Sequence, residues 1–262
     1  MKTLIMGILN YTPDSFSDGG MYYTPELASK HAAEMQEQGA DIIDIGCNST
    51  RPGSGILGEA EELMRLKEVL PAVRDAVKVP LSVDTFYTEC ARYALENGAQ
   101  IINDVGGKFN KKTAALVKAA DAKYIVMHNP CGADKIADYP GGAVKAVREF
   151  FESCISLSKE SGLSPENLWL DPGFGFGKSR EDNFELLANL EKLKFEGFPI
   201  LIGISRKRFI RQGSPAESDL ATSAANTVAI LGGADIIRVH NVSAAVEVRR
   251  VADATMKGKE NG

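Results

Sequence analysis

The chain has 262 residues, of which 44% are hydrophobic and 25% are charged, a composition that is typical of a folded globular protein and excludes a disordered or fibrous one. Lys and Arg number 30 against 35 Asp and Glu, so the net charge of −5 provides no global positive field for extended binding to nucleic acid or to an anionic membrane. The length alone is compatible with one large domain or two smaller ones.

The cysteines and the N-terminal sequence indicate a reducing compartment. Cys47, Cys90, Cys131 and Cys154 are far apart in the chain and form no CxxC pair, a pattern that argues against a disulfide framework or a structural zinc site. The apolar run at residues 4–9 is too short for a signal peptide, and no stretch has the length of a membrane span. We therefore expect a cytoplasmic protein.

Short apolar runs alternate with helical patterns along the whole chain. The runs are rich in β-branched residues and almost continuously apolar, as is typical of parallel strands that are covered on both faces. The predicted strands are Thr3–Asn10, Ala40–Gly46, Pro80–Thr85, Ala99–Val105, Ala122–His128, Leu168–Gly173, Pro199–Ser205 and Ala234–His240. The predicted helices are Pro25–Glu37, Glu59–Ala76, Glu89–Asn97, Lys111–Ala120, Gly142–Ser161, Arg180–Leu193, Ser218–Leu231 and Val242–Met256.

The spacing of these strands predicts the fold. Successive strands begin about 33 residues apart, which is the length of one βα unit, and parallel crossovers have a fixed hand. No linker rich in Pro, Gly or Ser divides the chain. We therefore predict a single (β/α)8 TIM barrel over residues 1–262, with its active site at the C-terminal ends of the strands. A doubly wound open sheet is the alternative.

Polar residues follow each predicted strand, and in a barrel these strand ends meet at one rim. One Asp at a strand end is often only the N-cap of the next helix. Eight polar strand ends at one rim are better explained by a common site. In chain order they carry Asn10 with residues 12–20, residues 48–53, Asp84, Asn103 and Asp104, His128, Asp171, Ser205 to Lys207, and Arg238 with His240.

The side chains at these ends fall into two chemical groups. One group donates hydrogen bonds to an anion such as an oligophosphate, and the other accepts them from a ligand with neighbouring N–H groups, such as the edge of a guanidine-like heterocycle. The donors are Arg51, Lys207, Arg238 and His240, and the acceptors are Asp84, Asn103 and Asp171. We expect a pocket shared by a polar heterocycle and a phosphate.

One competing motif resembles the end of a nucleotide-binding P-loop. Residues 173–179 read GFGFGKS, but Pro172 occupies the position of the first Walker A glycine and two Phe interrupt the loop. We therefore do not predict a P-loop here.

Two long motifs point to a known family. Residues 8–20 read ILNYTPDSFSDGG, and residues 41–46 (DIIDIG) are followed by STRPG at 49–53. Shorter motifs lie at 82–85, 102–105, 170–173, 205–207 and 238–240. Through these motifs the sequence resembles the dihydropteroate synthase family of the pterin-binding barrel superfamily over essentially its whole length.

The resemblance implies a transferase of folate biosynthesis. Such an enzyme condenses 6-hydroxymethyl-7,8-dihydropterin pyrophosphate with 4-aminobenzoate, giving 7,8-dihydropteroate and pyrophosphate with the help of Mg²⁺. It further implies an SN1-like course, with the methylene cation stabilised by the carboxylate of Asp84 or Asp14. A sulfonamide should compete with 4-aminobenzoate, and a homodimer is expected.

The resemblance also assigns roles to residues. Catalytic roles would belong to Asp84, Lys207, Asp14 and Arg51. The pterin would be bound by Asp84, Asn103, Asp171 and Lys207. Pyrophosphate and metal would be held by Asn10, Arg238 and His240, with Asn10 as the metal ligand. A loop over the anion would complete the aminobenzoate pocket through Thr50, Arg51 and Pro52, beside Phe176.

Three departures from the family pattern keep alternatives open. Cys47 and Asn48 replace a Gly and a Glu, Asn129 begins a segment that lacks the family's Arg after Met-His, and Arg208 replaces a small Ser. Arg208 could clash with aminobenzoate, pair with its carboxylate or weaken sulfonamide binding. The alternatives are a pterin-dependent methyltransferase acting on a corrinoid protein, which the anion-site residues disfavour, and a catalytically impaired pterin-binding paralogue.

Overall fold

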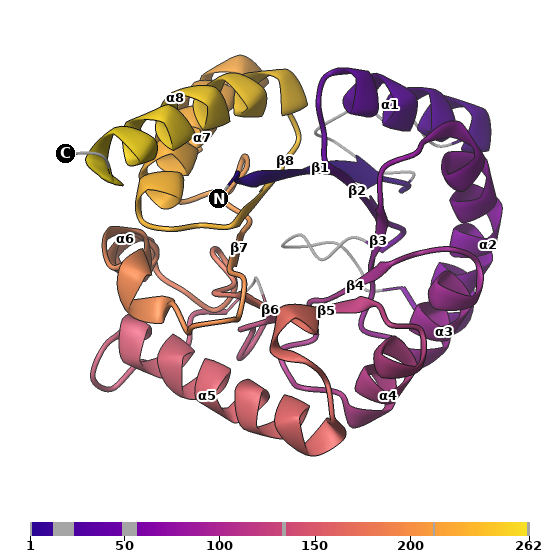
Figure 1. Ribbon diagram of the computed structural model, residues 1–262, viewed down its shortest axis with the longest axis horizontal. Coiled ribbons are helices and arrows are strands. Elements are labelled where there is room, and N and C mark those ends of the chain that lie inside the picture. Colours follow the sequence, from indigo (N-terminus) through magenta and orange to yellow (C-terminus); the bar gives the residue numbers. More distant parts are fainter. Residues whose placement is uncertain (1, 13–23, 49–56, 133–134, 212, 261–262) are drawn as a thin grey trace.

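The computed structural model describes residues 2–12, 24–48, 57–132, 135–211 and 213–260. Within these ranges eight parallel strands form a ring that eight α-helices surround, which confirms the predicted (β/α)8 barrel (Figure 1). The strands are β1 (Leu4–Asn10), β2 (Ile42–Gly46), β3 (Leu81–Asp84), β4 (Ile101–Asp104), β5 (Lys123–Met127), β6 (Leu168–Asp171), β7 (Leu201–Ile202) and β8 (Ile236–Val239). The helices are α1 (Pro25–Glu37), α2 (Glu59–Ala76), α3 (Thr88–Glu96), α4 (Lys111–Ala119), α5 (Ala143–Ser161), α6 (Arg180–Ala188), α7 (Pro215–Leu231) and α8 (Val242–Glu260), with 3₁₀ helices η1 (Pro165–Asn167) and η2 (Leu190–Leu193).

Neighbouring strands pair in the order β6-β5-β4-β3-β2-β1-β8-β7. The ring closes between β6 and β7 through an isolated parallel bridge of Leu170 with Ile200, where the Leu170 N–H donates to the Pro199 carbonyl at 2.9 Å. Closure therefore depends on few hydrogen bonds, because β7 is only two residues long.

The strand side chains alternate between an outer and an inner apolar layer. On β2, Ile43 and Ile45 pack between the sheet and the helices, whereas Ile42 lies inside the ring. The inner cluster consists of Met6, Ile42, Ile101, Ile125, Trp169, Leu201 and Ile236, with Leu4 packed against it. Because side chains repeat every two residues, the position two residues further along each strand also faces inward, nearer the C-terminal rim. Four of those positions are polar: Asp44, Asn103, Asp171 and Arg238.

Six helices differ in extent from the sequence prediction: α3, α4 and α5 by one residue at one or both ends, α8 by four residues at its C-terminal end, and α6 and α7 for reasons that the contacts show. The helix predicted over 180–193 is interrupted at Asn189, whose φ of −124° and ψ of 30° are not helical. Helix α7 begins three residues earlier than predicted, because Ser214 and Glu217 form a capping box that starts it at Pro215. In that box the Ser214 N–H donates to the Glu217 carboxylate at 2.6 Å.

Candidate functional site

A cavity of about 860 Å³ opens at the C-terminal ends of the strands. Eight of the residues proposed from sequence line it together: Asn10, Asp84, Asn103, Asp171, Phe176, Lys207, Arg238 and His240. The other four, Asp14, Thr50, Arg51 and Pro52, lie outside the described residues. The volume falls in the range of small-molecule pockets. The strand ends therefore form one concave site, as the barrel predicts.

The guanidinium of Arg238 joins two carboxylates across the barrel. Its Nε donates to Asp44 Oδ2 at 2.6 Å and its Nη2 donates to Asp84 Oδ2 at 3.0 Å. Asn103 Nδ2 also donates to Asp44 Oδ2, at 3.1 Å. Sequence reasoning set Arg238 among the anion donors, apart from the acceptors, but here it is tied to both groups. Asp44, which that reasoning assigned no role, is the fully buried centre of this network.

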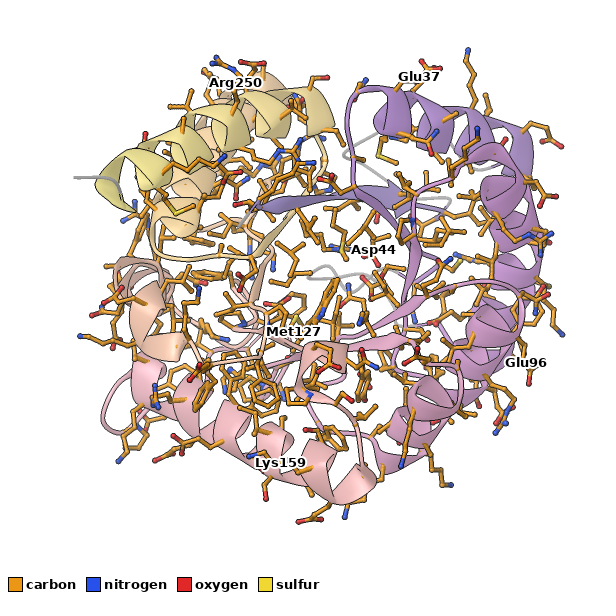
Figure 2. The ribbon with its side chains drawn as sticks, viewed as in Figure 1. Glu37, Asp44, Glu96, Met127, Lys159 and Arg250 are labelled. Carbon is orange, nitrogen blue, oxygen red and sulfur yellow. The ribbon has the colours of Figure 1, made fainter. Side chains whose placement is uncertain are left out.

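Figure 2 shows Asp44 toward the middle of the ring, whereas Glu37, Glu96, Lys159 and Arg250 extend from the outer helices. A charged side chain within an apolar strand, at the same parity as the inward-facing Ile42, was the signal that could have found it.

Two buried acceptor oxygens near the C-terminal ends of the strands are left without a partner, and one of them belongs to Asn103, which lines the cavity. Asp44 Oδ1 and Asn103 Oδ1 are buried, and neither accepts a hydrogen bond from any residue in the described ranges. Leaving a buried acceptor unpaired costs about 1–3 kcal/mol. A ligand that presents N–H groups here would remove that cost. Burial raises the pKa of the nearby Asp84 to about 7, with Arg238 opposing the rise and Asp44 adding to it.

Elsewhere in the cavity, the charges of Asp171 and Lys207 attract each other, and each shifts the pKa of the other. Asp171 Oδ1 accepts a hydrogen bond from the Gly173 N–H at 2.7 Å, and burial raises its pKa while Lys207 lowers it. Lys207 Nζ donates to the Phe174 carbonyl and lies 4.5 Å from the centre of the Phe176 ring. Burial lowers the pKa of Lys207 to about 8, against the attraction of Asp171. Lys207 is thus a desolvated cation at the cavity wall.

The loop after β7, which carries Lys207, has an unusual backbone conformation at the preceding residue. Arg206 has φ +56°, the left-handed region that a residue with a side chain seldom adopts. Its guanidinium holds Asp219 on α7 at 2.7 and 3.0 Å, and its N–H donates to Thr222 Oγ1 at 3.1 Å. Arg206 is therefore anchored to α7.

His240 is fixed beside Ser205, because its N–H donates to Ser205 Oγ at 3.2 Å and its Nδ1 lies 2.9 Å from the same oxygen. Both residues line the cavity. This contact joins the end of β8 to the loop that carries Lys207, so the proposed anion residue His240 and the proposed pterin residue Lys207 belong to one connected wall.

A second buried lysine, Lys178, lines the cavity and was passed over in the sequence. Its Nζ lies 2.9 Å from the Gly173 carbonyl, 3.0 Å from the Phe176 carbonyl and 3.0 Å from His128 Nδ1. Burial lowers its pKa to about 7, with Asp171 opposing the change. The GFGFGKS segment that contains Lys178 is not predicted to be a P-loop, and the contacts of the lysine are to two backbone carbonyls and the His128 ring.

The departures from the family pattern at 47–48 have a structural counterpart. Asn48 Nδ2 donates to Glu62 Oε2 at 2.8 Å, and Asn48 Oδ1 accepts from the Leu57 N–H at 3.1 Å. Glu62 also accepts a hydrogen bond from the hydroxyl of Thr85. A buried carboxylate from α2 therefore occupies the neighbourhood where the sequence lacks the family's Glu.

The two other departures have different surroundings. Asn129 Nδ2 donates to the Val105 carbonyl at 2.9 Å, and its Oδ1 accepts from the Gly132 N–H at 2.7 Å, so this side chain ties the loops after β4 and β5. Arg208 is exposed and lines the cavity.

The side-chain oxygens of Asn10 and Asp84 indicate whether the cavity could hold a magnesium ion. A Cβ built on Gly46 would lie 3.8 Å from Asn10 Oδ1 and 3.9 Å from Asp84 Oδ2, so both oxygens flank the same bare stretch of backbone. Among the residues with described positions, no cluster of three or more His, Cys, Asp or Glu could hold a metal alone. Mg²⁺ commonly takes one or two protein oxygens and completes its shell with phosphate and water. The residues present therefore fit a magnesium ion shared with a phosphate, and not a protein cage.

Comparisons with known proteins agree with this site. The family described as pterin binding enzyme matches residues 6–240. A dihydropteroate synthase of Synechocystis is 43% identical over 97% of this chain and 90% of its own length. The Yersinia pestis dihydropteroate synthase, solved with a sulfonamide drug, superposes with a TM-score of 0.91 at 35% identity, covering 98% of this chain and 95% of its own. The Xanthomonas albilineans enzyme with 4-aminobenzoic acid gives a TM-score of 0.89 at 39% identity, covering 97% and 93%.

Proposed function

The chain belongs to the dihydropteroate synthase family, and on that premise we propose how its residues divide the reaction. Like its relatives, it is a transferase of folate biosynthesis. The substrates we assign are 6-hydroxymethyl-7,8-dihydropterin pyrophosphate and 4-aminobenzoate. The products are 7,8-dihydropteroate and pyrophosphate.

The pterin occupies the base of the cavity in this proposal. Its N–H groups meet the unpartnered oxygen of Asn103 and the carboxylates of Asp84 and Asp171, while Lys207 donates to a pterin acceptor. The orphaned buried oxygen supports this assignment most directly, because it needs a donor that the described part of the chain does not supply.

The pyrophosphate lies nearer the rim, where Arg238, His240 and Asn10 line the cavity. Asn10 is the residue we assign to Mg²⁺, which when bound would neutralise charge on the phosphate oxygens. Phe176 would border the aminobenzoate ring. Thr50, Arg51 and Pro52 would complete that pocket; they lie outside the described residues, so this part of the proposal depends on the resemblance alone.

The reaction we propose is an SN1-like displacement. The C–O bond of the pterin methylene breaks and its electron pair leaves with pyrophosphate, whose growing charge the cationic donors stabilise. The resulting cation is spread into the pterin and stabilised by the carboxylate of Asp84 or Asp14. The aniline nitrogen then attacks, the C–N bond forms and the nitrogen loses a proton. Since a neutral aniline needs no strong base, positioning supplies most of the catalysis at this step.

Convergence of Asp84, Asn103, Asp171 and Lys207 on one cavity carries the proposal. The test is to incubate the protein with the pterin pyrophosphate, 4-aminobenzoate and Mg²⁺, and to measure dihydropteroate and pyrophosphate. We expect both products in equal amounts, inhibition by a sulfonamide, and a steep loss of turnover in Asp171→Asn with the fold retained. Pterin binding without either product would instead identify an impaired paralogue. Demethylation of methyl-tetrahydrofolate with a corrinoid protein would identify a methyltransferase.

We also propose that the chain forms a homodimer through α7 and α8, which pack against each other. Half of the large apolar side chains that are conspicuously exposed in the described ranges lie on these two helices: Leu220, Val228, Leu231 and Val251. Large apolar side chains exposed on two helices that pack together are a surface that a partner chain could cover. Light scattering should give the mass of two chains, and Leu220→Glu should shift it toward one. A monomeric parent protein at micromolar concentration would contradict the proposal.

We further propose that residues 1–262 act as one pterin-binding domain in the cytoplasm. All four cysteines are free thiols. No helix among the described residues has the length and apolar content needed to cross a bilayer. Fractionation of cells that express the tagged protein tests the location, and limited proteolysis into two stable fragments would contradict the single domain.

A further inference from the structure

The loop that follows β6 is built around the ammonium group of Lys178. Lys178 is 6% exposed, and its Nζ contacts the carbonyls of Gly173 and Phe176 at 2.9 and 3.0 Å. It reaches His128 as well, with Nδ1 at 3.0 Å and the carbonyl oxygen at 3.3 Å. An ammonium has three N–H donors, so the three shorter contacts use all of them. A single cation thus holds this loop to the end of β5.

The neutral state of His128 makes that arrangement consistent. Burial lowers the pKa of His128 to about 3, with the Lys178 charge adding to the effect, so the ring is neutral near pH 7. A protonated Lys178 can only donate, so while it carries its charge Nδ1 is the acceptor and the ring proton is on Nε2. Three neutral acceptors therefore take the three N–H groups of the Lys178 ammonium.

The same loop supplies the contacts described for Lys207. The carbonyl of Phe174 accepts from Lys207 Nζ, and the Phe176 ring lies 4.5 Å from it. Between them, Gly175 packs so closely that a Cβ there would stand 2.9 Å from Lys207 Cδ. Gly175 also has φ +77°, so a side chain would be both crowded and strained. All three contacts come from residues 174–176.

We propose that Lys178 is a positioning residue for Lys207. Lys178 grips the carbonyls of residues 173 and 176, which bracket the segment that contacts Lys207. By holding these two carbonyls in place, Lys178 fixes the position of the Lys207 ammonium relative to Asp171 and the cavity. The catalytic meaning of this arrangement rests on the proposed function, whereas the effect on Lys207 itself does not.

The first test measures Lys207 without substrate. In protein labelled with ¹³C at lysine Cε, the Lys207 resonance is assigned by its loss in Lys207→Arg and titrated with pH. Lys178→Met keeps an unbranched side chain of similar length but cannot donate a hydrogen bond. We expect its Lys207 resonance to titrate closer to the ordinary value of 10.5, because a loosened loop admits water. Loss of the Lys178 charge acts in the same direction, and Lys178→Gln, which loses the same charge but keeps N–H donors, separates the two effects. Unchanged Lys207 titration in a folded Lys178→Met protein would overturn the proposal.

Two further variants make this result interpretable. Lys123→Met is the matched control, because Lys123 is also partly buried but lies at the N-terminal end of β5, where its Nζ donates to Asn167 Oδ1 at 2.5 Å. It should leave the Lys207 titration unchanged. If Lys178→Met does not fold, Lys178→Gln retains N–H donors and should give a smaller shift in the same direction. An unshifted Lys178→Gln resonance would then overturn the proposal.

The second test is a double-mutant cycle on kcat/KM for the pterin pyrophosphate. We expect Lys178→Met to lower kcat/KM about tenfold in the parent protein and less than about twofold in a Lys207→Met background, because contacting residues are not additive. A loss of about tenfold in both backgrounds would mean that Lys178 supports the fold in general, and would overturn the proposal. If no variant, nor the parent, forms product, the proposed function fails while the Lys207 titration still decides the positioning role.

Discussion

The two ends of the barrel treat buried charge in opposite ways. At the N-terminal end, Asp41 pairs with Lys2 at 2.8 Å and with Arg249, and accepts from the Ile5 N–H at 2.9 Å. These partners outweigh burial and lower the pKa of Asp41. At the C-terminal end, burial outweighs the partners of Asp84 and Lys207, so the pKa of Asp84 rises to about 7 and that of Lys207 falls to about 8. Arg238 is the exception there, because its carboxylate partners outweigh burial and raise its pKa.

The difference separates stability from function within one fold. A carboxylate with a lowered pKa stabilises the folded state whenever it is ionised. Side chains whose charged forms are disfavoured by burial destabilise the folded state when they are charged, and such groups are concentrated at functional sites. At the C-terminal rim, a ligand would therefore supply partners that stabilise these charges, whereas at the N-terminal end the protein already supplies the partners of Asp41.

The largest effect should come from removing the cation at the rim. Lys207→Met should lower kcat by about 10²–10³-fold, as expected when a group that stabilises developing charge or orients the substrate is lost. The melting temperature should change by only a few degrees, because the lost charge was unfavourably buried. Steady-state kinetics and thermal unfolding measure the two effects. Turnover within a factor of two of the parent would remove Lys207 from the catalytic site.

The pH dependence of activity should follow the rim groups. If turnover requires ionised Asp84 and protonated Lys207, kcat/KM rises with pH toward about 7 and falls above about 8. Each limb should change activity about tenfold per pH unit beyond its pKa. Initial rates between pH 5 and 10 in buffers of constant ionic strength measure this. Activity that is flat from pH 5.5 to 9.5 would show that neither group titrates in the rate-determining step.

The N-terminal end should respond in stability and not in activity. Asp41→Asn removes a charged partner of Lys2 and Arg249, and should lower the free energy of unfolding by about 1–3 kcal/mol at pH 7. Because the folded-state pKa of Asp41 is lowered, its contribution is present above the unfolded value of 3.8 and is lost as the pH falls through the folded value. Urea unfolding at pH 7 and pH 3 measures this difference. A fall in kcat of more than threefold would contradict the separation of the two ends.

The smallest effect tests the coupling within the rim. Asp44 raises the pKa of Asp84 by like-charge repulsion. Asp44→Asn keeps the shape of the side chain but removes that repulsion, so the acidic limb of the pH profile should move to lower pH by about half a unit to one unit. Asp41→Asn is the matched control, since it removes a carboxylate at the other end and should leave the limb in place. A limb that moves to higher pH would assign it to another group.

Much of the site could be predicted because barrel geometry puts all strand ends at one rim. Asp84, Asn103, Asp171 and Arg238 were found in this way, and the structure gathers them around one cavity. Asp44 was missed although it stands two residues before the end of its predicted strand, as Asn103 and Arg238 do in theirs. The regular alternation of inward positions reveals it. Contacts such as the bridge from Arg238 to Asp44 join residues far apart in sequence, and they follow from the pairing of β1 with both β2 and β8.

The fold was predicted from spacing, and its local exceptions depend on side-chain contacts. The helical pattern continues through residue 189, but Asn189 Nδ2 donates to the Glu185 carbonyl at 2.8 Å and competes with the next helical turn. The apolar sequence at residues 199–205 likewise does not indicate that β7 is only two residues long. The role of Lys178 was hidden because its partners are backbone carbonyls, which sequence does not distinguish.

The single bridge between Leu170 and Ile200 gives the barrel a seam, and this seam runs between the strands that lead to Asp171 and Lys207. Backbone amides along a weakly bonded edge exchange their hydrogens with solvent sooner than those in a full ladder. A ligand bound by both Asp171 and Lys207 would link the two sides of that seam and hold them together. Substrate binding should therefore slow amide exchange at Leu170, whose N–H donates across the seam, and at residues 200–202 on the other side of it.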